Sequence, residues 1–172
     1  MPKPESATER AVGLRALLTR DHQELDELFT SLLDALRADA RVDVSRLWSA
    51  LDAGLYRHMA LEEQEVLPLL RQQDAREANA LLAEHDEIRA KLAELGMGID
   101  LHEVVVQTVA DFIEQLRRHA RREDALAYRW AEQHLPAARQ AEVHGALAAA
   151  RALRARLLGL GRKAKVSVSS SH

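Results

Sequence analysis

The sequence predicts an all-α protein, an up-down-up-down antiparallel four-helix bundle with one additional C-terminal helix. Leu, Ala, Arg and Glu dominate its 172 residues, aromatic residues make up only 3%, and β-branched runs are rare outside residues 104–106. This composition favours helices over strands. Apolar residues also recur every three or four positions in long segments with short connections between them, which is the spacing of one buried helix face.

The first two helices are expected over residues 8–38 and 44–73, with residues 39–43 as their connection. In the first helix, Leu14, Leu18 and Leu25 lie along one face. In the second, Pro68 comes late and is expected to kink or shorten the last turn, because proline lacks the N–H that a helix interior needs.

The third helix is expected over residues 75–95 and is ended by Gly96 and Gly98, because glycine is common just past a helix end. Asp100 and Glu103 resemble a capping box, so the fourth helix is expected to begin at Asp100 and to run to about residue 134. The two glycines lie much closer in sequence to His85 than to His119, whereas a simple hairpin would have similar distances on both sides. This predicts either a loop that runs along the bundle after the glycines or a late start of the fourth helix.

The domain boundaries follow from these helices. Residues 8–135 are expected to form the bundle, and a fifth helix over residues 137–158, within a segment spanning 136–160, is expected to pack on it or to mediate homo-oligomers. Residues 161–172 are rich in Gly, Lys and Ser and are expected to form a disordered tail.

Composition and charge exclude several classes of protein. Hydrophobic residues are 47% and charged residues 30%, and no apolar run approaches the roughly 20 residues needed to cross a bilayer. The lack of cysteine rules out disulfide scaffolds and thiolate metal sites. A net charge of −3 gives no argument for nucleic-acid or membrane binding, and the first residues show no secretory signal pattern. We therefore expect a cytoplasmic single-domain protein with no nucleic-acid and no membrane partner.

Each of the four bundle helices places one or two ionisable side chains in its apolar face. In the first helix, for example, His22 lies between Leu18 and Leu25 in the inward series. The second and fourth helices each carry a histidine followed by a glutamate four residues later, which puts both side chains on one face. The six residues singled out in this way are His22, His58, Glu62, His85, His119 and Glu123.

These positions also form an internal repeat. The segment DHQEL around His22 resembles EHDEI around His85, and the pair His58 and Glu62 resembles the pair His119 and Glu123. Two similar helical hairpins related by a pseudo-twofold axis would bring both halves to one shared central site.

The residue types predict that this site holds metal. A carboxylate buried alone is costly, whereas two carboxylates among four imidazoles are accounted for by bound cations. Neutral imidazole and carboxylate suit iron, manganese or zinc. Two bridging carboxylates with two histidines on each ion would form a dinuclear centre with open coordination positions, which permits small-molecule binding or redox chemistry.

Over about residues 15–135 this pattern resembles the hemerythrin-like (HHE cation-binding) family. That resemblance implies a four-helix bundle with a non-haem di-iron centre. It also implies that His22 and His58 hold one iron, that His85 and His119 hold the other, and that Glu62 and Glu123 bridge them. The ligands it implies are dioxygen, peroxide, nitric oxide or iron itself.

Two features depart from the oxygen-carrying hemerythrins. Those proteins carry H-x-x-x-H on the third helix, where this chain has Arg89 at the second position, and they use an aspartate that Asp124 would match on the fourth. We favour Glu123 because it repeats the spacing of Glu62. The missing histidine changes the ligand count of one iron, which turns the expectation from reversible oxygen carriage toward peroxide chemistry, gas sensing or iron handling.

Other interpretations remain open at the level of sequence. Glu63 and Asp124 are expected to support the ligands or to be solvated, and Arg89 to be solvated or salt-bridged. The arginines of the fifth helix, including Arg154, are expected to form a solvated face, and Tyr128 is expected to pack in the core or to line the metal pocket. The competing functions are a metal-free helical protein-interaction module and a di-iron enzyme acting on peroxide.

Overall fold

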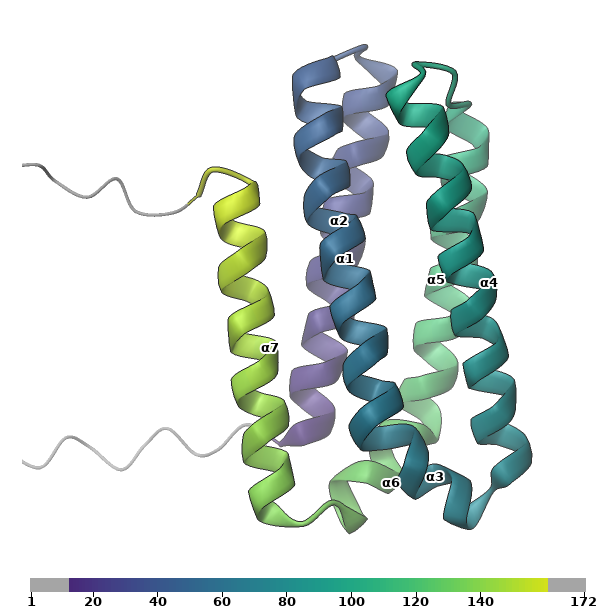
Figure 1. Ribbon diagram of the computed structural model, residues 1–172, viewed down its shortest axis with the longest axis vertical. Coiled ribbons are helices and arrows are strands. Elements are labelled where there is room, and N and C mark those ends of the chain that lie inside the picture. The colour runs from purple at the N-terminus through teal and green to yellow at the C-terminus, as the bar shows by residue number, and fades with distance from the viewer. Residues whose placement is uncertain (1–12, 161–172) are drawn as a thin grey trace, which may run out of the picture.

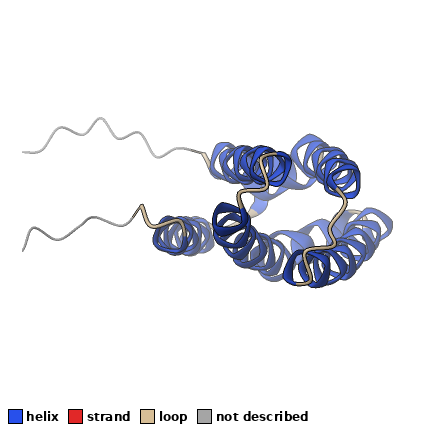
Figure 2. Cartoon of the chain, turned by 90° about the horizontal axis from the view of Figure 1, so that it is seen from above, coloured by secondary structure: helices blue, strands red, loops and turns tan. Residues whose placement is uncertain are grey.

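The computed structural model describes residues 13–160, and every regular element in that range is a helix. The all-α prediction is therefore confirmed. Four long helices lie side by side: α1 (Leu14–Arg37), α2 (Arg41–Leu61), α4 (Ala75–Asp100) and α5 (Val106–Ala125) (Figure 1). Short turns join α1 to α2 and α4 to α5, and two further helical segments connect α2 to α4. Seen from above, these four helices form a ring, and α7 (Ala137–Leu157) stands outside it (Figure 2).

The second expected helix is interrupted rather than continuous. After α2 the backbone widens into a π-helical turn, η1 (Glu62–Val66), and resumes as α3 (Leu67–Gln73). Pro68 is the second residue of α3, so its missing N–H falls where a helix leaves N–H groups unpaired in any case. The expected kink is thus a wide turn before the proline, and it begins at Glu62.

The boundary between the third and fourth helices was predicted wrongly. α4 does not stop at Gly96 but continues through Gly98 to Asp100, and α5 begins at Val106 instead of Asp100. A Cβ atom on Gly96 would lie 3.3 Å from the indole nitrogen of Trp48, so this glycine permits close helix packing and does not end a helix. The long α4 and late α5 explain the uneven spacing around the glycines.

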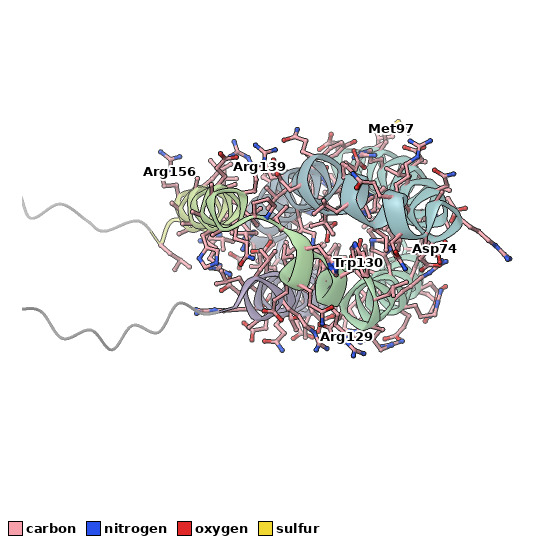
Figure 3. All side chains as sticks on the ribbon, turned by 90° about the horizontal axis from the view of Figure 1, so that it is seen from below. Asp74, Met97, Arg129, Trp130, Arg139 and Arg156 are labelled. Carbon is pink, nitrogen blue, oxygen red and sulfur yellow. The ribbon has the colours of Figure 1, made fainter. Side chains whose placement is uncertain are left out.

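The fourth expected helix is also divided near its end. Leu126 has a non-helical backbone (φ −128°, ψ −63°), and α6 (Ala127–His134) follows it. Figure 3 shows α6 lying across the lower end of the bundle, where it carries Trp130. The short helices α3 and α6 contact each other and close this end.

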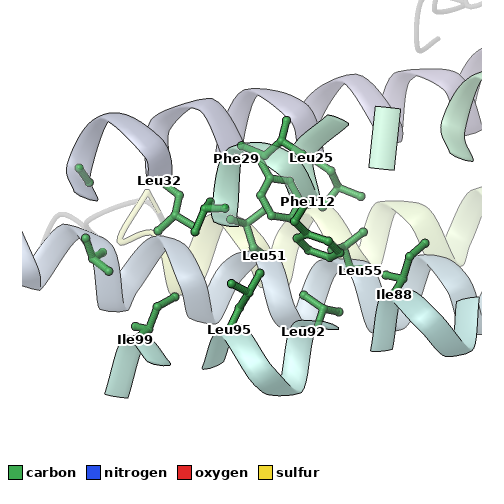
Figure 4. Close-up of a cluster of buried hydrophobic side chains, with 14 of the residues drawn as sticks. Leu25, Phe29, Leu32, Leu51, Leu55, Ile88, Leu92, Leu95, Ile99 and Phe112 are labelled. Atoms are coloured by element: carbon green, nitrogen blue, oxygen red, sulfur yellow. The ribbon is translucent and has the colours of Figure 1, made fainter. Parts of the chain in front are cut away.

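The interior contains two apolar clusters separated along the bundle axis. The first is built around Phe29 and Phe112, whose rings pack edge to face, with their centroids 5.9 Å apart (Figure 4). The second surrounds Leu14, Leu18 and Tyr128 near the end closed by α3 and α6. His22 lies between Leu18 of one cluster and Leu25 of the other, so the predicted polar residues occupy the layer between the two clusters.

α7 packs against α1 and α2 and buries one face. Its buried residues are Val143, Leu147, Ala150 and Arg154. Arg154 is 4% exposed, so the expectation that it belongs to a solvated face is wrong. Arg139 and Arg156 do project outward from this helix (Figure 3).

Among residues 13–160 there is no helix long and apolar enough to cross a membrane. The first part of the expected helix 8–38 and the expected disordered tail 161–172 lie outside the described residues.

Candidate metal centre

The structure brings the six predicted side chains into one buried cluster in the middle of the bundle. Their potential ligand atoms form two overlapping groups, and within each group every atom lies within 4.8 Å of the others. One group contains His22, His58, Glu62 and Glu123, and the other contains Glu62, His85, His119 and Glu123. Each histidine presents Nε2 to the cluster; the Nε2 atoms of His22 and His58, for instance, are 2.8 Å apart.

The two glutamates join the two groups because each divides its oxygens between them. Glu62 places Oε1 3.1 Å from His58 Nε2 and Oε2 3.4 Å from His85 Nε2. Glu123 places Oε2 3.3 Å from His22 Nε2 and Oε1 3.1 Å from His119 Nε2. Two carboxylates that each span two pairs of imidazoles have the arrangement of bridging ligands.

Part of this cluster has no hydrogen-bond partner within the described chain. Glu62 Oε2 and His119 Nε2 are both buried, and neither makes a hydrogen bond of suitable geometry, although His85 Nε2 and Glu123 Oε1 lie 3.4 and 3.1 Å from them. Leaving such groups unsatisfied costs stability, so they call for a partner that the protein itself does not supply. A cation in each group would provide it, and nitrogen and oxygen donors of this kind fit iron, manganese or zinc.

Three of the four histidines donate a hydrogen bond from their other ring nitrogen, Nδ1, to a carboxylate. The Nδ1 groups of His58, His85 and His119 are bonded to Asp21 at 2.9 Å, to Glu63 at 2.8 Å and to Glu84 at 2.7 Å, respectively. Such a bond fixes the tautomer with the proton on Nδ1 and leaves the Nε2 lone pair facing the centre.

Each of these three carboxylates is in turn paired with an arginine. Glu63 accepts a hydrogen bond of 2.6 Å from Arg89, Glu84 pairs with Arg122, and Asp21 pairs with Arg154 at 2.5 Å. The expectation for Glu63 and Arg89 is met, since Glu63 supports His85 and Arg89 is salt-bridged. Asp21, Glu84, Arg122 and Arg154 had not been singled out for any role at the site.

When no metal is bound, the cluster is held together by attraction between protonated histidines and ionised glutamates. Burial disfavours protonation of His85, but Glu123 and Glu62 outweigh it and raise the pKa of His85 to about 10. Burial and the charge of Glu123 oppose ionisation of Glu62, yet His58 and His85 lower the pKa of Glu62 to about 2. Because metal needs neutral imidazoles, metal binding must release protons from this network.

Tyr128 adds a hydroxyl group to the centre from α6. It is fully buried, its oxygen lies 3.1 Å from the Nε2 atoms of both His22 and His58, and it donates a hydrogen bond to Glu62. Tyr128 combines the two roles open to it, because its ring packs in the apolar cluster around Leu14 and Leu18 and its hydroxyl group lies next to the polar cluster. Burial and the two glutamates raise the pKa of this phenol well above its ordinary value, so it stays protonated.

A comparison with known families decides what kind of domain this is. The model of the hemerythrin HHE cation-binding domain matches residues 14–131, which is more than half of the chain. The chain belongs to this family. In the same comparisons, no curated protein sequence and no solved structure matched the chain.

The family assignment supports cation binding by the domain, and the structure gives Glu123 and Asp124 different surroundings. In this hemerythrin-family chain Glu123 points into the cluster, whereas Asp124 accepts hydrogen bonds from Arg15 at 3.0 Å and Thr19 at 2.7 Å, at the edge of the bundle. The pairing with Arg15 lowers the pKa of Asp124. Of the remaining histidines in the described range, His102 and His134 are exposed and His144 is half-buried, and none belongs to either group.

A cavity of about 450 Å³ leads from the surface of this hemerythrin-family domain to the cluster. It runs between α1 and α5; His22, His58 and His119 line it together with apolar side chains such as Phe29 and Leu116. Its solvent-exposed part includes the ion pair of Arg117 with Asp26, whose Nε and Oδ1 atoms are 2.6 Å apart. One edge of the site is therefore accessible to a small ligand.

Proposed function

We propose that this up-down-up-down bundle holds a non-haem di-iron centre and binds or senses a small ligand such as dioxygen, peroxide or nitric oxide there. His22 and His58 would hold one iron, His85 and His119 the other, and Glu62 and Glu123 would bridge them. The observation that supports this most directly is the division of the oxygens of each glutamate between the two pairs of histidines.

Two histidines and two carboxylate oxygens would give each ion four protein ligands, which would leave positions free on an ion that accepts six. When bound, iron at such positions supplies reversible redox chemistry and coordination of diatomic or peroxidic ligands. The cavity between α1 and α5 reaches His22 and His58, so we propose that the external ligand arrives at this pair.

The chain's own residues prepare the site for such a ligand. Phe29 and Leu116 keep the cavity apolar next to the centre, which favours an uncharged ligand over an ion. The hydroxyl group of Tyr128 lies 3.1 Å from His22 Nε2 and donates its hydrogen bond to Glu62, so it holds one of the proposed bridging carboxylates at that end of the centre.

Metal content and the ultraviolet-visible spectrum of the freshly purified protein test this proposal. We expect about two irons per chain, with a charge-transfer band in air, and loss of iron from the His58→Ala and Glu62→Ala variants. The matched control is His144→Gln, which changes a histidine outside both groups and should keep its iron. Iron-free protein that also takes up no ferrous iron under anaerobic reconstitution would reject the di-iron assignment, and manganese or zinc in place of iron would change the chemistry.

Tyr128 also favours a second candidate, the breakdown of peroxide at the same centre. Disproportionation converts two molecules of hydrogen peroxide into dioxygen and two of water, so it needs no further reductant. The buried phenol of Tyr128 keeps its proton and lies 3.1 Å from the Nε2 atoms of His22 and His58, so it could hydrogen-bond to a peroxide oxygen at the open pair. This candidate predicts turnover that disappears in His119→Ala and falls in Tyr128→Phe while the latter keeps its metal; equal turnover in Tyr128→Phe and the unaltered protein would argue against the role of the phenol.

A further inference from the structure

The C-terminal helix α7 reaches the candidate centre through one buried side chain. Arg154 donates from Nη2 to Asp21 Oδ1 at 2.5 Å and to Glu24 Oε2 at 2.9 Å. Arginine is rarely buried unless it is paired, so this contact fixes α7 on the bundle at one place. α7 lies beyond residues 14–131, the part of the chain that the family match covers.

Asp21 uses its two oxygens for two different partners. Oδ1 accepts from Arg154, and Oδ2 accepts from His58 Nδ1 at 2.9 Å. Arg151 of the same helix has its Nε 3.8 Å from Oδ1, beyond hydrogen-bond distance, and bonds to Glu24 at 3.0 Å instead. The side chain of Asp21 is fully buried, so no solvent replaces either partner. Arg154 therefore holds Asp21 in the orientation in which His58 turns its Nε2 toward the cluster.

The packing between α2 and α7 leaves space for this arrangement at Gly54. A Cβ atom there would lie 3.1 Å from Cδ of Arg154 and 2.9 Å from a methyl group of Leu25. Gly54 is itself buried within α2, four residues before His58. Absence of a side chain at this position allows the arginine to pass between the helices to Asp21.

Burial distinguishes Arg154 from the arginines behind the other two histidines. The side chain of Arg154 is 5% exposed, against 26% for Arg89 and 38% for Arg122. Water can replace a partly exposed guanidinium as a partner of its carboxylate, but it does not reach Asp21. The loss of Arg154 should therefore disturb its histidine more than the loss of either other arginine.

We infer that Arg154 is a positioning residue of the metal centre and that α7, through Arg154 and Asp21, completes the placement of the His58 ligand. The inference rests on the proposed function, since it assumes that His58 binds metal. It makes the C-terminal helix part of the site and not only a cover over the bundle.

Anaerobic titration with Co²⁺, followed by its visible absorption and by competition with a chelator, tests this role. Supporting partners of metal-bound histidines typically change metal affinity by about 10–100-fold. We expect a loss of that size in Arg154→Gln, together with a changed Co²⁺ spectrum. The matched control is Arg139→Gln on the same helix, which removes an ion pair with Glu65 at 2.8 Å and should stay within about twofold of the unaltered protein.

A double-mutant cycle separates positioning from general damage to the fold. If Arg154 acts through Asp21, Arg154→Gln should cost less than about twofold in an Asp21→Asn background. Arg154→Lys keeps the charge and should recover part of the affinity. If Arg154→Gln fails to fold, Arg154→Lys takes its place in the cycle.

Two results would overturn the inference. These are an Arg154→Gln protein that binds Co²⁺ like Arg139→Gln, or a loss in Arg154→Gln, or in Arg154→Lys where Arg154→Gln does not fold, that is equal in both Asp21 backgrounds. An unaltered protein that takes up no Co²⁺ would instead reject the proposed function.

Discussion

The acidic residue that precedes the histidine on α1, and again on α4, supports a histidine on the next long helix. Asp21 bonds to His58 and Glu84 bonds to His119. The internal repeat thus includes the supporting carboxylates as well as the histidines, as a pseudo-twofold site requires. The exception is His22: Asp124, the counterpart of Glu63, accepts hydrogen bonds from Arg15 and Thr19 instead. The least supported histidine is therefore one of those that line the cavity.

A change at Glu84 tests the supporting carboxylates at the scale of one residue. Glu84→Gln keeps the shape of the side chain but removes the charge that fixes the tautomer of His119, so we expect about 10–100-fold weaker metal binding. Glu87→Gln alters an exposed acid on the same helix and provides the control. Chelator competition measures both; equal affinity in the two variants would show that Glu84 has no such role.

The six cluster residues could be predicted from sequence because their spacing repeats within helices whose apolar faces are easy to follow. Tyr128 and Arg154 could not be predicted in the same way, because their contacts depend on how α6 and α7 turn back onto the bundle. In the sequence Arg154 resembles a surface residue, because nothing near it in the chain indicates that it pairs with the buried Asp21. For Asp21 and Glu84, the repeat itself contained the signal.

At the scale of elements, the π-helical turn η1 is the feature that local sequence rules describe least well. Glu62 begins this wide turn and points into the cluster, while Glu63 reaches His85 and Glu65 reaches Arg139 on α7. Wide turns of this kind occur often at functional sites. Here three acidic side chains of the turn serve three different partners, and the sequence predicted a regular helix at this place.

The contact between α2 and α7 gives a prediction about stability. Gly54→Ala places a methyl group against Leu25 and Arg154, so we expect a loss of about 1–3 kcal/mol in the free energy of unfolding, as in other overpacked sites. Gly145→Ala on α7 meets nothing within 4 Å and should stabilise the protein by about 0.5–1 kcal/mol through helix propensity. Urea unfolding of the two variants in the presence of chelator measures the difference. An increased free energy of unfolding in both variants would contradict the tight packing at Gly54.

For the whole molecule, metal binding and pH are linked with a definite sign. In the chelated protein the pKa of His85 is about 10, against about 6.5 in an unfolded chain, so its contribution to stability is complete below pH 6.5 and is lost as the pH rises toward 10. In the metal-bound protein the imidazoles that bind metal are already neutral, so they have no such proton to lose.

We therefore expect the free energy of unfolding to fall between pH 6.5 and 9 in the chelated protein more steeply than in the loaded protein. Urea unfolding with chelator and with Zn²⁺ at several pH values measures this difference. His85→Gln, studied in chelator, should reduce the slope, and His58 and His119, whose pKa values are also raised by the neighbouring carboxylates, should account for the remainder. Parallel slopes for the chelated and loaded forms would contradict the proposed exchange of protons for metal.

The separation of the apolar interior into two clusters has a consequence for how the bundle opens. The cluster around Phe29 and Phe112 and the cluster around Leu14 and Tyr128 meet only across the polar layer. Ions that tie all four long helices together in that layer would make the two ends unfold as one cooperative unit. Without them, the two ends are free to exchange their amide hydrogens independently of each other, so occupancy of the centre would set the cooperativity of the fold.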